Sequence, residues 1–323
     1  MITVTCLNPA LDITHEVDGV DWSGVNRPGH VRARPGGKGL NVASTLLAIG
    51  ARARVLGLAG GATGADVTSA LAGLGVPATF SPVGGETRRT FAVVDTRHGR
   101  TALFNEPGPE VTPDEYAAFL VSYEKALADS AAVVLSGSLP RGLPAGAYGD
   151  LVAAAAAAGV PAVLDTSGEA LSRGAAARPA IVKPNVAELE ALTGRVLTGR
   201  ALAAADGPDL RPVSDAATQL RLSGPEAVVV SLGPAGLWAA TAEGAWRAVP
   251  PGEVFSNPTG AGDAVTAGLA HGLVQGQPWP ERLRHAAALG TAAAAAPVAG
   301  EFSAGDYQRV LAQVTVSRAE YSA

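Results

Sequence analysis

The chain has 323 residues, of which 47% are hydrophobic, so it is long and apolar enough to bury a sizeable core. Its single cysteine, Cys6, excludes an internal disulfide framework and a cysteine-based zinc site. A net charge of −5, from 24 basic and 29 acidic residues, gives no polybasic signature for binding nucleic acid or an anionic membrane.

Predicted strands and helices alternate in the first quarter of the chain. A β-branched, alternating segment predicts a strand over Ile2–Leu7, and apolar residues at helical spacing predict a helix over Leu40–Ile49. Gly50 follows that helix, as glycine does at many helix ends. A strand over Arg54–Leu58, a helix over Asp66–Leu74 and a strand over Val76–Phe80 come next.

Two polar stretches interrupt this alternation. Asp12–Arg34 and Thr87–Asn105 both predict antiparallel strand pairs. In the second stretch, Phe91–Val94 and Thr101–Phe104 flank a turn. Hairpins inserted into an α/β core are candidate lids over a site, and plain surface excursions are the alternative.

Between residues 113 and 231, short apolar runs again alternate with helical stretches. Pro113–Leu127 predicts an amphipathic helix. Buried strands that alternate with helices predict a parallel sheet covered on both faces, and hence an α/β fold. The predicted strands are Ala132–Leu135, Ala162–Leu164, Ala180–Val182 and Ala227–Ser231, and the further helices are Ala145–Ala158, Val186–Leu192 and Asp215–Leu222.

No segment predicts export or membrane insertion. The N-terminus lacks the basic flank and long apolar run of a signal peptide. The longest apolar stretch, from Leu151 to Leu164, contains Gly159 and Pro161 and is shorter than the roughly 20 residues of a membrane helix. We therefore expect a soluble, cytoplasmic protein.

The strongest local motif is Gly260-Ala261-Gly262-Asp263, which precedes an apolar helical run over Ala264–Val274. The two glycines let the backbone approach a ligand closely, and the amides of a helix N-terminus attract an anion. Three roles are open to Asp263: it caps the helix, holds a metal, or acts as a general base beside a phosphate.

A second glycine-rich turn, Gly36-Gly37-Lys38-Gly39, also leads into a predicted helix, which begins at Leu40. Its spacing is not that of a Walker A loop, and no Gly-x-Gly-x-x-Gly fingerprint occurs, which weighs against a Rossmann dehydrogenase. Close backbone approach beside a cation suits a polar small ligand. The alternative is a plain strand-to-helix turn with a solvated Lys38.

Three further clusters end predicted strands, where ligands gather in open α/β sheets. Lys183-Pro184-Asn185 is followed by Glu188, and two oxygen-bearing side chains at this spacing can contact Mg²⁺ through its waters. A helix capping box explains the same pair equally well. The other two clusters are Ser136–Pro140, which contains Ser138, and Ser231–Gly236.

Taken together and in order, these motifs resemble those of the ribokinase-like carbohydrate kinases of the phosphofructokinase B family. Within it they are most similar to the 1-phosphofructokinases and the tagatose-6-phosphate kinases. The resemblance extends from residue 3 to about residue 296. It implies a three-layer α/β/α core with a mostly parallel central sheet, and one kinase domain over residues 1–323. The insertions at about 12–34 and 87–105 would form a small β-sheet lid, through which homodimers commonly pair.

The resemblance also implies an ATP- and Mg²⁺-dependent kinase acting on a sugar phosphate. Asp263 would be the base that deprotonates the accepting hydroxyl, and the amides of Gly260, Ala261 and Gly262 would form an anion hole. The sugar would contact Asp12, Gly36, Gly37, Lys38 and Asn41. Candidates for binding its existing phosphate are Arg27, Lys38, Arg88 and Ser138. Lys183, Asn185, Ser231, Gly233 and Gly236 would serve the nucleotide, and Asn185 and Glu188 would hold Mg²⁺ through water.

D-Fructose 1-phosphate is the first expected substrate, and fructose 1,6-bisphosphate its product. Tagatose 6-phosphate and fructose 6-phosphate are same-class alternatives, because the motifs do not say which carbon carries the phosphate. A ribose or nucleoside kinase fits less well, given the cations near the sugar. A non-catalytic sugar-phosphate-binding regulator would have lost the base or the anion hole, and both are present here. In two places the chain departs from the family pattern, with Pro258 before the glycine turn and Arg141 after Ser-Leu-Pro.

Overall fold

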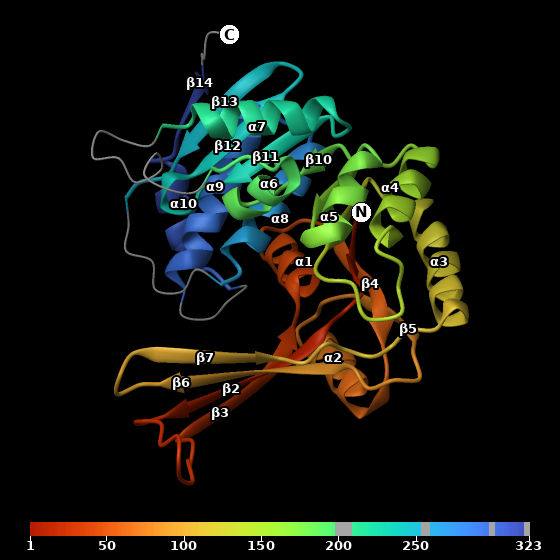
Figure 1. The fold of residues 1–323 in the computed structure, drawn as a ribbon, viewed down its shortest axis with the longest axis vertical. Coiled ribbons are helices and arrows are strands. Elements are labelled where there is room, and N and C mark those ends of the chain that lie inside the picture. Colours follow the sequence, from red (N-terminus) through yellow and green to blue (C-terminus); the bar gives the residue numbers. More distant parts are fainter. Residues whose placement is uncertain (198–208, 253–258, 297–300, 320–323) are drawn as a thin grey trace.

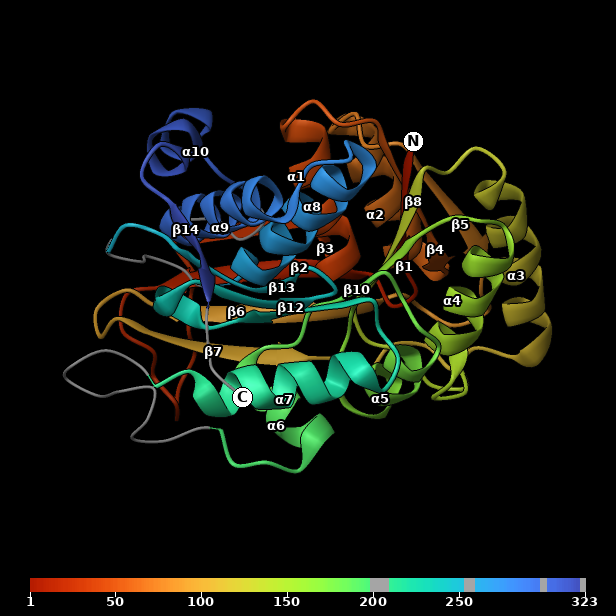
Figure 2. The same cartoon turned by 90° about the horizontal axis from the view of Figure 1, so that it is seen from above.

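The strands of the computed structural model form two separate sheets, one of ten strands and one of four (Figure 1). The structure describes residues 1–197, 209–252, 259–296 and 301–319. The larger sheet lies between two layers of helices, and the smaller sheet extends from one end of this core (Figures 1 and 2). The expected α/β core with a separate small sheet is confirmed.

The main sheet is mostly parallel. Its order is β14-β13-β12-β11-β10-β9-β8-β1-β4-β5, and only the pairings among β11, β12, β13 and β14 are antiparallel. The strands are β1 (Ile2–Cys6), β4 (Ala53–Ala59), β5 (Ala78–Pro82), β8 (Ala132–Ser136), β9 (Ala162–Asp165), β10 (Ile181–Val182), β11 (Ala227–Ser231), β12 (Leu237–Thr241), β13 (Gly244–Val249) and β14 (Thr315–Ala319). Every residue of β1, β8 and β9 is buried, as parallel strands covered on both faces require.

Two apolar clusters fill the spaces between the sheet and its helices. One packs α3 (Pro113–Leu127), α4 (Ala147–Ala157), α5 (Gly168–Ala176), α6 (Val186–Thr193) and α7 (Arg211–Leu222) against one face. The other packs α1 (Lys38–Ala48), α2 (Gly61–Gly73), α8 (Ala261–Val274), α9 (Trp279–Ala295) and α10 (Ala304–Leu311) against the opposite face (Figure 2). Among the described helices, none is long and apolar enough to cross a membrane.

The sequence predicts a helix most accurately when the residues that start the helix lie next to it in the chain. The predicted helix over Pro113–Leu127 is α3, and its capping box joins Thr112 and Glu115. By contrast, α2 begins at Gly61 rather than the predicted Asp66, because the Glu86 carboxylate from a distant loop accepts the Thr63 N–H. The prediction missed α5 between β9 and β10, and it gave no elements after Glu301, where α10 and β14 form.

The small sheet combines the two predicted insertions. Its order is β3-β2-β6-β7, and it contains β2 (Ala10–Val17), β3 (His30–Gly36), β6 (Arg88–Asp95) and β7 (Arg100–Asn105). The two antiparallel hairpins meet through a parallel pairing of β2 with β6. We call this sheet the lid. The register places Ile13, Phe91 and Phe104 on one face, and Asp12, Thr90 and Arg34 on the other.

Candidate active site

Polar residues collect where the central parallel strands end. Asn8 follows β1, Ser138 follows β8, Asp165 ends β9, Lys183 follows β10 and Ser231 ends β11. These strands are neighbours in the sheet, so their carboxyl ends form one continuous edge, the usual ligand position in such folds. Asn8 Nδ2 donates a 3.1 Å hydrogen bond to Ser138 Oγ across this edge.

The N-terminus of α8 faces the same region. Gly260 precedes the helix with a φ of 86°, a left-handed conformation that favours glycine, and within the described part of the chain no side chain caps the amides. Asp263, in the first turn, therefore does not cap its helix. Its buried carboxylate instead accepts a 2.8 Å hydrogen bond from Asn41 Nδ2 on α1. The cap role of Asp263 is wrong, and the amides stay available for an anion.

The environment of Asp263 shifts its acidity toward neutrality. Burial raises the pKa of this carboxyl to about 7, and the nearby negative charge of Asp165 acts in the same direction. The Asn41 hydrogen bond and the positive charges of Lys38 and Lys183 oppose the shift without cancelling it. A carboxylate that titrates near neutral pH is suited to accept a proton in catalysis.

Asp165 was not among the predicted site residues, although it lies at the centre of the site. Its Oδ1 lies 3.3 Å from Lys38 Nζ, and its Oδ2 lies 3.3 Å from Lys183 Nζ. Burial alone would raise the pKa of Asp165, but Lys183 and Lys38 outweigh it and hold the pKa below its usual value. The sequence signal was an acid at the end of the predicted strand Ala162–Leu164.

Glycines connect the lid directly to α1. β3 ends at Gly36, Gly37 adopts a φ of 109°, and α1 begins at Lys38. A side chain at Gly36 would collide with the Asp12 carboxylate. The Asp12 carboxylate of the lid therefore lies against Gly36, two residues before Lys38.

Arg88 joins the lid to the core, whereas Arg27 lies apart. The Arg88 Nε donates a 3.2 Å hydrogen bond to the Asn8 carbonyl, which brings its guanidinium to the same edge as Ser138. Arg27 is exposed in the loop from β2 to β3, at the end of the lid opposite Gly36 (Figure 1). Arg34, which the sequence prediction omitted, stands opposite Asp12 on the lid face that also carries Arg88.

The predicted nucleotide residues form a second group along the edge. Asn185 bridges Ser231 at the end of β11, and Gly233 and Gly236 have φ values of 60° and 90° in the turn that follows. A side chain at Gly262 would approach within 3.5 Å of Lys183 Nζ, so this lysine lies over the glycine turn of α8. Asn257 and Pro258 lie outside the described residues.

Asn185 and Glu188 form the capping box that the sequence left as an alternative to Mg²⁺ binding. Each side chain accepts the other residue's backbone N–H at 2.8 Å. The charge of Glu188 nevertheless contributes to raising the pKa of Lys38, after the larger effect of Asp165. No cluster of three or more metal-ligating side chains occurs in the described residues. This donor set fits Mg²⁺ held through water and ligand phosphates, the usual mode for this ion.

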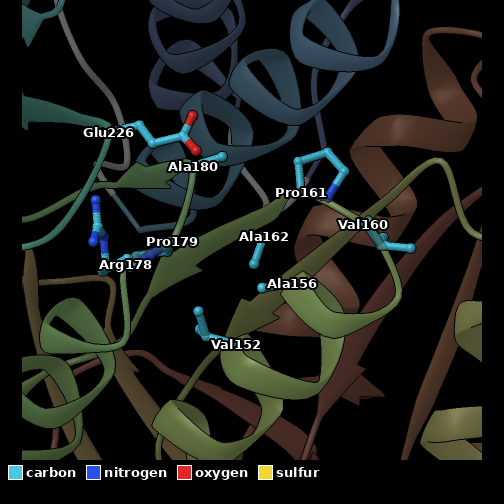
Figure 3. Close-up of a pocket in the computed structure, with 10 residues that line it drawn as sticks. Val152, Ala156, Val160, Pro161, Ala162, Arg178, Pro179, Ala180 and Glu226 are labelled. Atoms are coloured by element: carbon cyan, nitrogen blue, oxygen red, sulfur yellow. The ribbon is translucent and has the colours of Figure 1, made fainter.

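A small cavity of 260 Å³ lies at the opposite edge of the main sheet, before β9, β10 and β11 (Figure 3). Val160, Arg178 and Glu226 contribute to its lining. Arg178 has a φ of 66°, the one positive value for a non-glycine residue in the described chain. The cavity shares no residue with the candidate site.

A buried carboxylate, a helix N-terminus and two lysines meet at the end of a parallel sheet, an arrangement that suits phosphoryl transfer. The comparisons agree. A profile of the pfkB family of carbohydrate kinases matches residues 6–303. The chain is 38% identical to a 1-phosphofructokinase of Rhodobacter capsulatus, over 89% of this chain and 88% of that protein.

Solved structures show the same relationship. Phosphofructokinase-2 of Escherichia coli has a TM-score of 0.87 and 31% identity, covering 96% of this chain and 98% of that chain. A Thermotoga maritima protein described as a possible 1-phosphofructokinase has a TM-score of 0.84 and 26% identity, covering 99% of each chain. The chain belongs to the pfkB family of carbohydrate kinases, and within it to the sugar-phosphate kinases.

Proposed function

We propose that this kinase transfers the γ-phosphoryl group of ATP to the free hydroxymethyl group of D-fructose 1-phosphate, giving fructose 1,6-bisphosphate. The observation that carries the proposal is Asp263: a buried carboxyl with a pKa raised to about 7, beside uncapped helix amides. The similarity to a 1-phosphofructokinase over most of the chain supports this choice of sugar phosphate. Core and lid act as one kinase domain in the cytoplasm, where ATP is available.

In this mechanism Asp263 accepts the proton of the attacking hydroxyl. The amides of Gly260, Ala261 and Gly262 stabilise the charge on the migrating phosphoryl group, because the helix start orients them in advance and no side chain among the described residues caps them. Bound Mg²⁺ supplies charge neutralisation on the nucleotide phosphates, with Asn185 and Glu188 as its outer ligands.

Lid and core together bind the sugar phosphate. Asp12 would accept hydrogen bonds from sugar hydroxyls, and Asn41 would donate to one or accept from one. Arg88 and Ser138, which are linked through Asn8, are candidates for binding the existing phosphate. Arg27 remains a candidate that requires movement of the lid tip. Lys38 is paired with Asp165, at the end of the site that holds Asp263.

A second candidate substrate is fructose 6-phosphate, because the Escherichia coli phosphofructokinase-2 was solved in complex with it. Tagatose 6-phosphate is a third, which the sequence resemblance left open. The non-catalytic alternative is disfavoured because the base and anion-hole residues are present and adjacent.

A coupled assay of ADP release across a substrate panel tests the proposal. Fructose 1-phosphate should give the highest kcat/KM, followed by fructose 6-phosphate and tagatose 6-phosphate, with fructose and ribose far lower. If fructose 6-phosphate or tagatose 6-phosphate gave the highest kcat/KM, that sugar phosphate would be the substrate instead of fructose 1-phosphate. Turnover of none of the five would contradict the kinase assignment to sugar phosphates.

We also propose that two lids pair face to face in a homodimer. One lid face carries Ile13, Val31, Phe91 and Phe104 in register, and Val31 and Phe104 are 57% and 54% exposed. An exposed apolar sheet face of this kind is normally covered by a partner. The Escherichia coli phosphofructokinase-2 has been solved in a tetrameric inhibited form, so the oligomeric state of this chain has to be measured directly.

Light scattering after gel filtration tests the dimer. Phe104→Asp should convert the dimer to a monomer. Leu103→Asp is the matched control, because Leu103 is 64% exposed on the opposite lid face. A wild-type monomer, or equal dissociation by both substitutions, would contradict pairing through the apolar face.

A further inference from the structure

Asp165 is the most completely buried carboxylate of the site, and the proposed steps give it no role. We propose that Asp165 is a positioning residue that fixes Lys38, Lys183 and the first turn of α8 around the path of the transferred phosphoryl group. This inference rests on the proposed function and adds two cations at the phosphoryl-transfer end of the site.

The contacts of Asp165 reach three separate elements. Asp165 ends β9, and its Oδ1 pairs with Lys38 at the start of α1. Its Oδ2 pairs with Lys183 after β10 and accepts a 2.7 Å hydrogen bond from Thr266 Oγ1 on α8. One carboxylate therefore connects three elements: the start of α1 after the Gly36–Gly39 turn, Lys183 after β10, and α8, whose N-terminus would form the anion hole.

The link to α8 reaches the anion hole itself. Thr266 Oγ1 also lies 3.0 Å from the carbonyl oxygen of Gly262, one helical turn earlier. Lys183 Nζ lies 3.5 Å from where a Cβ on Gly262 would be. The contacts of Asp165 thus set the position of the Gly262 amide relative to the Lys183 ammonium group. Both groups would face the oxygens of the migrating phosphoryl group.

Charge balance explains why a carboxylate belongs at this position. Two ammonium groups that converge in a buried site repel each other, and a carboxylate between them lets both remain charged. Together, Lys38, Lys183 and Asp165 carry one net positive charge. This charge faces the open site, because the Lys38 side chain is 43% exposed while Asp165 is buried. A cation fixed in advance stabilises transition-state charge without reorganising.

Asp165 also acts on the base. The charged groups facing Asp263 are Lys38 from α1, Asp165 from β9 and Lys183 after β10, and Asn41 donates a hydrogen bond to it. Of these, only Asp165 is negative. Removing its charge should therefore let Asp263 ionise at lower pH.

The test compares Asp165→Asn with Thr266→Val. We expect Asp165→Asn to lower kcat by roughly 10²-fold, the usual effect of small misplacement, with little change in KM for the sugar phosphate. In ligand-free protein, carbon-13 NMR should show the Asp263 carboxyl titrating about one pH unit lower. Thr266→Val keeps the Asp165 charge, so it should lower kcat without moving that titration.

Lys38→Met gives a second test that does not need Asp165→Asn to fold. It should lower kcat, whereas an effect on KM for the sugar phosphate alone would assign Lys38 to the substrate's own phosphate and overturn the proposal. An unmoved Asp263 titration or an unchanged kcat in Asp165→Asn would also overturn it. Because the titration uses ligand-free protein, it distinguishes failure of this inference from failure of the proposed function.

Discussion

The main sheet and the lid hold their functional side chains in opposite ways. In the main sheet, strands buried on both faces end at Asp165 and just before Lys183, and both side chains are at most 5% exposed. In the lid, most residues of β3 and β7 are exposed, and salt bridges such as Arg97–Asp18 lie in solvent.

This difference suggests a division of labour. Charges interact strongly where water is excluded, so the core can shift a pKa and fix an ammonium group in place. Exposed lid charges are screened and held loosely, which suits a surface that meets the substrate and then releases it. Under the proposed function, proton and phosphoryl transfer would belong to the core, and the lid would add side chains such as Arg88 to the core residues that bind the sugar phosphate.

The largest expected effect is at Asp263, the proposed base in the core. Asp263→Asn should lower kcat by roughly 10²–10⁴-fold, because it removes the proton acceptor while the Asn41 hydrogen bond can remain. Steady-state kinetics measure this, with Asp306→Asn in the first turn of α10 as the matched control. Near-normal turnover in Asp263→Asn would give the base role to another residue.

The same substitution should stabilise the protein above neutral pH. Between the ordinary carboxyl pKa of 3.8 and about 7, folded Asp263 holds a proton that the unfolded chain has lost, so stability falls as pH rises. Above pH 7 the cost is roughly 4 kcal/mol. Thermal melts should therefore show Asp263→Asn with a higher Tm than wild type at pH 8 and an equal Tm near pH 4. Equal melting at both pH values would mean that the carboxylate is not destabilised by burial.

The next largest effect is on stability, and it should differ between a buried leucine of the main sheet and an exposed leucine of the lid. Leu135→Ala, in a fully buried position of β8, should lower the free energy of unfolding by about 2–5 kcal/mol through the cavity it leaves. Leu103→Ala in β7 should change it by less than about 0.5 kcal/mol, because the side chain is exposed. Chemical denaturation of both variants measures the difference. A comparable loss in Leu103→Ala would show that the lid is packed like the core.

The lid's contribution to binding should be smaller and selective. Arg88→Ala should raise KM for fructose 1-phosphate by roughly 10- to 150-fold, the effect of losing one charge-assisted contact of about 1.5–3 kcal/mol. KM for ATP should change little. Arg97→Ala, which removes a lid arginine paired in solvent with Asp18, is the control. Equal effects of the two substitutions would assign the loss to general charge rather than to Arg88.

The smallest effect separates two roles of Asn185. Asn185→Ala should lower the free energy of unfolding by about 1 kcal/mol, because it removes the cap of α6. Asn185→Asp should keep the cap. If Asn185 also serves Mg²⁺, the Mg²⁺ concentration for half-maximal activity should rise in the alanine variant and not in the aspartate variant. The same Mg²⁺ dependence in all three proteins would leave Asn185 as a cap alone.

Local patterns predicted the elements whose signals lie within the element itself. The Thr112–Glu115 capping box defines α3, and the Gly36–Gly39 turn marks the entry to α1. The start of α2 could not be predicted, because Glu86, well outside the helix, binds its first turn. The role of Asp165 could not be predicted for a related reason. Nothing in the sequence near this strand end indicates that Lys38 and Lys183 pair with its carboxylate in the folded chain.

The sequence alone determined the α/β class, the two lid insertions and the residue types of the site, because hydrophobic period, turn chemistry and motif order are local properties of the chain. Only the tertiary structure decided that the insertions join through β2 and β6, and that Asn41 meets Asp263 across 222 positions. It also decided that burial raises the pKa of Asp263, whereas the neighbouring Lys183 and Lys38 lower the pKa of the equally buried Asp165. The acidity of a carboxyl depends on the charges and water around it, and those are set by packing.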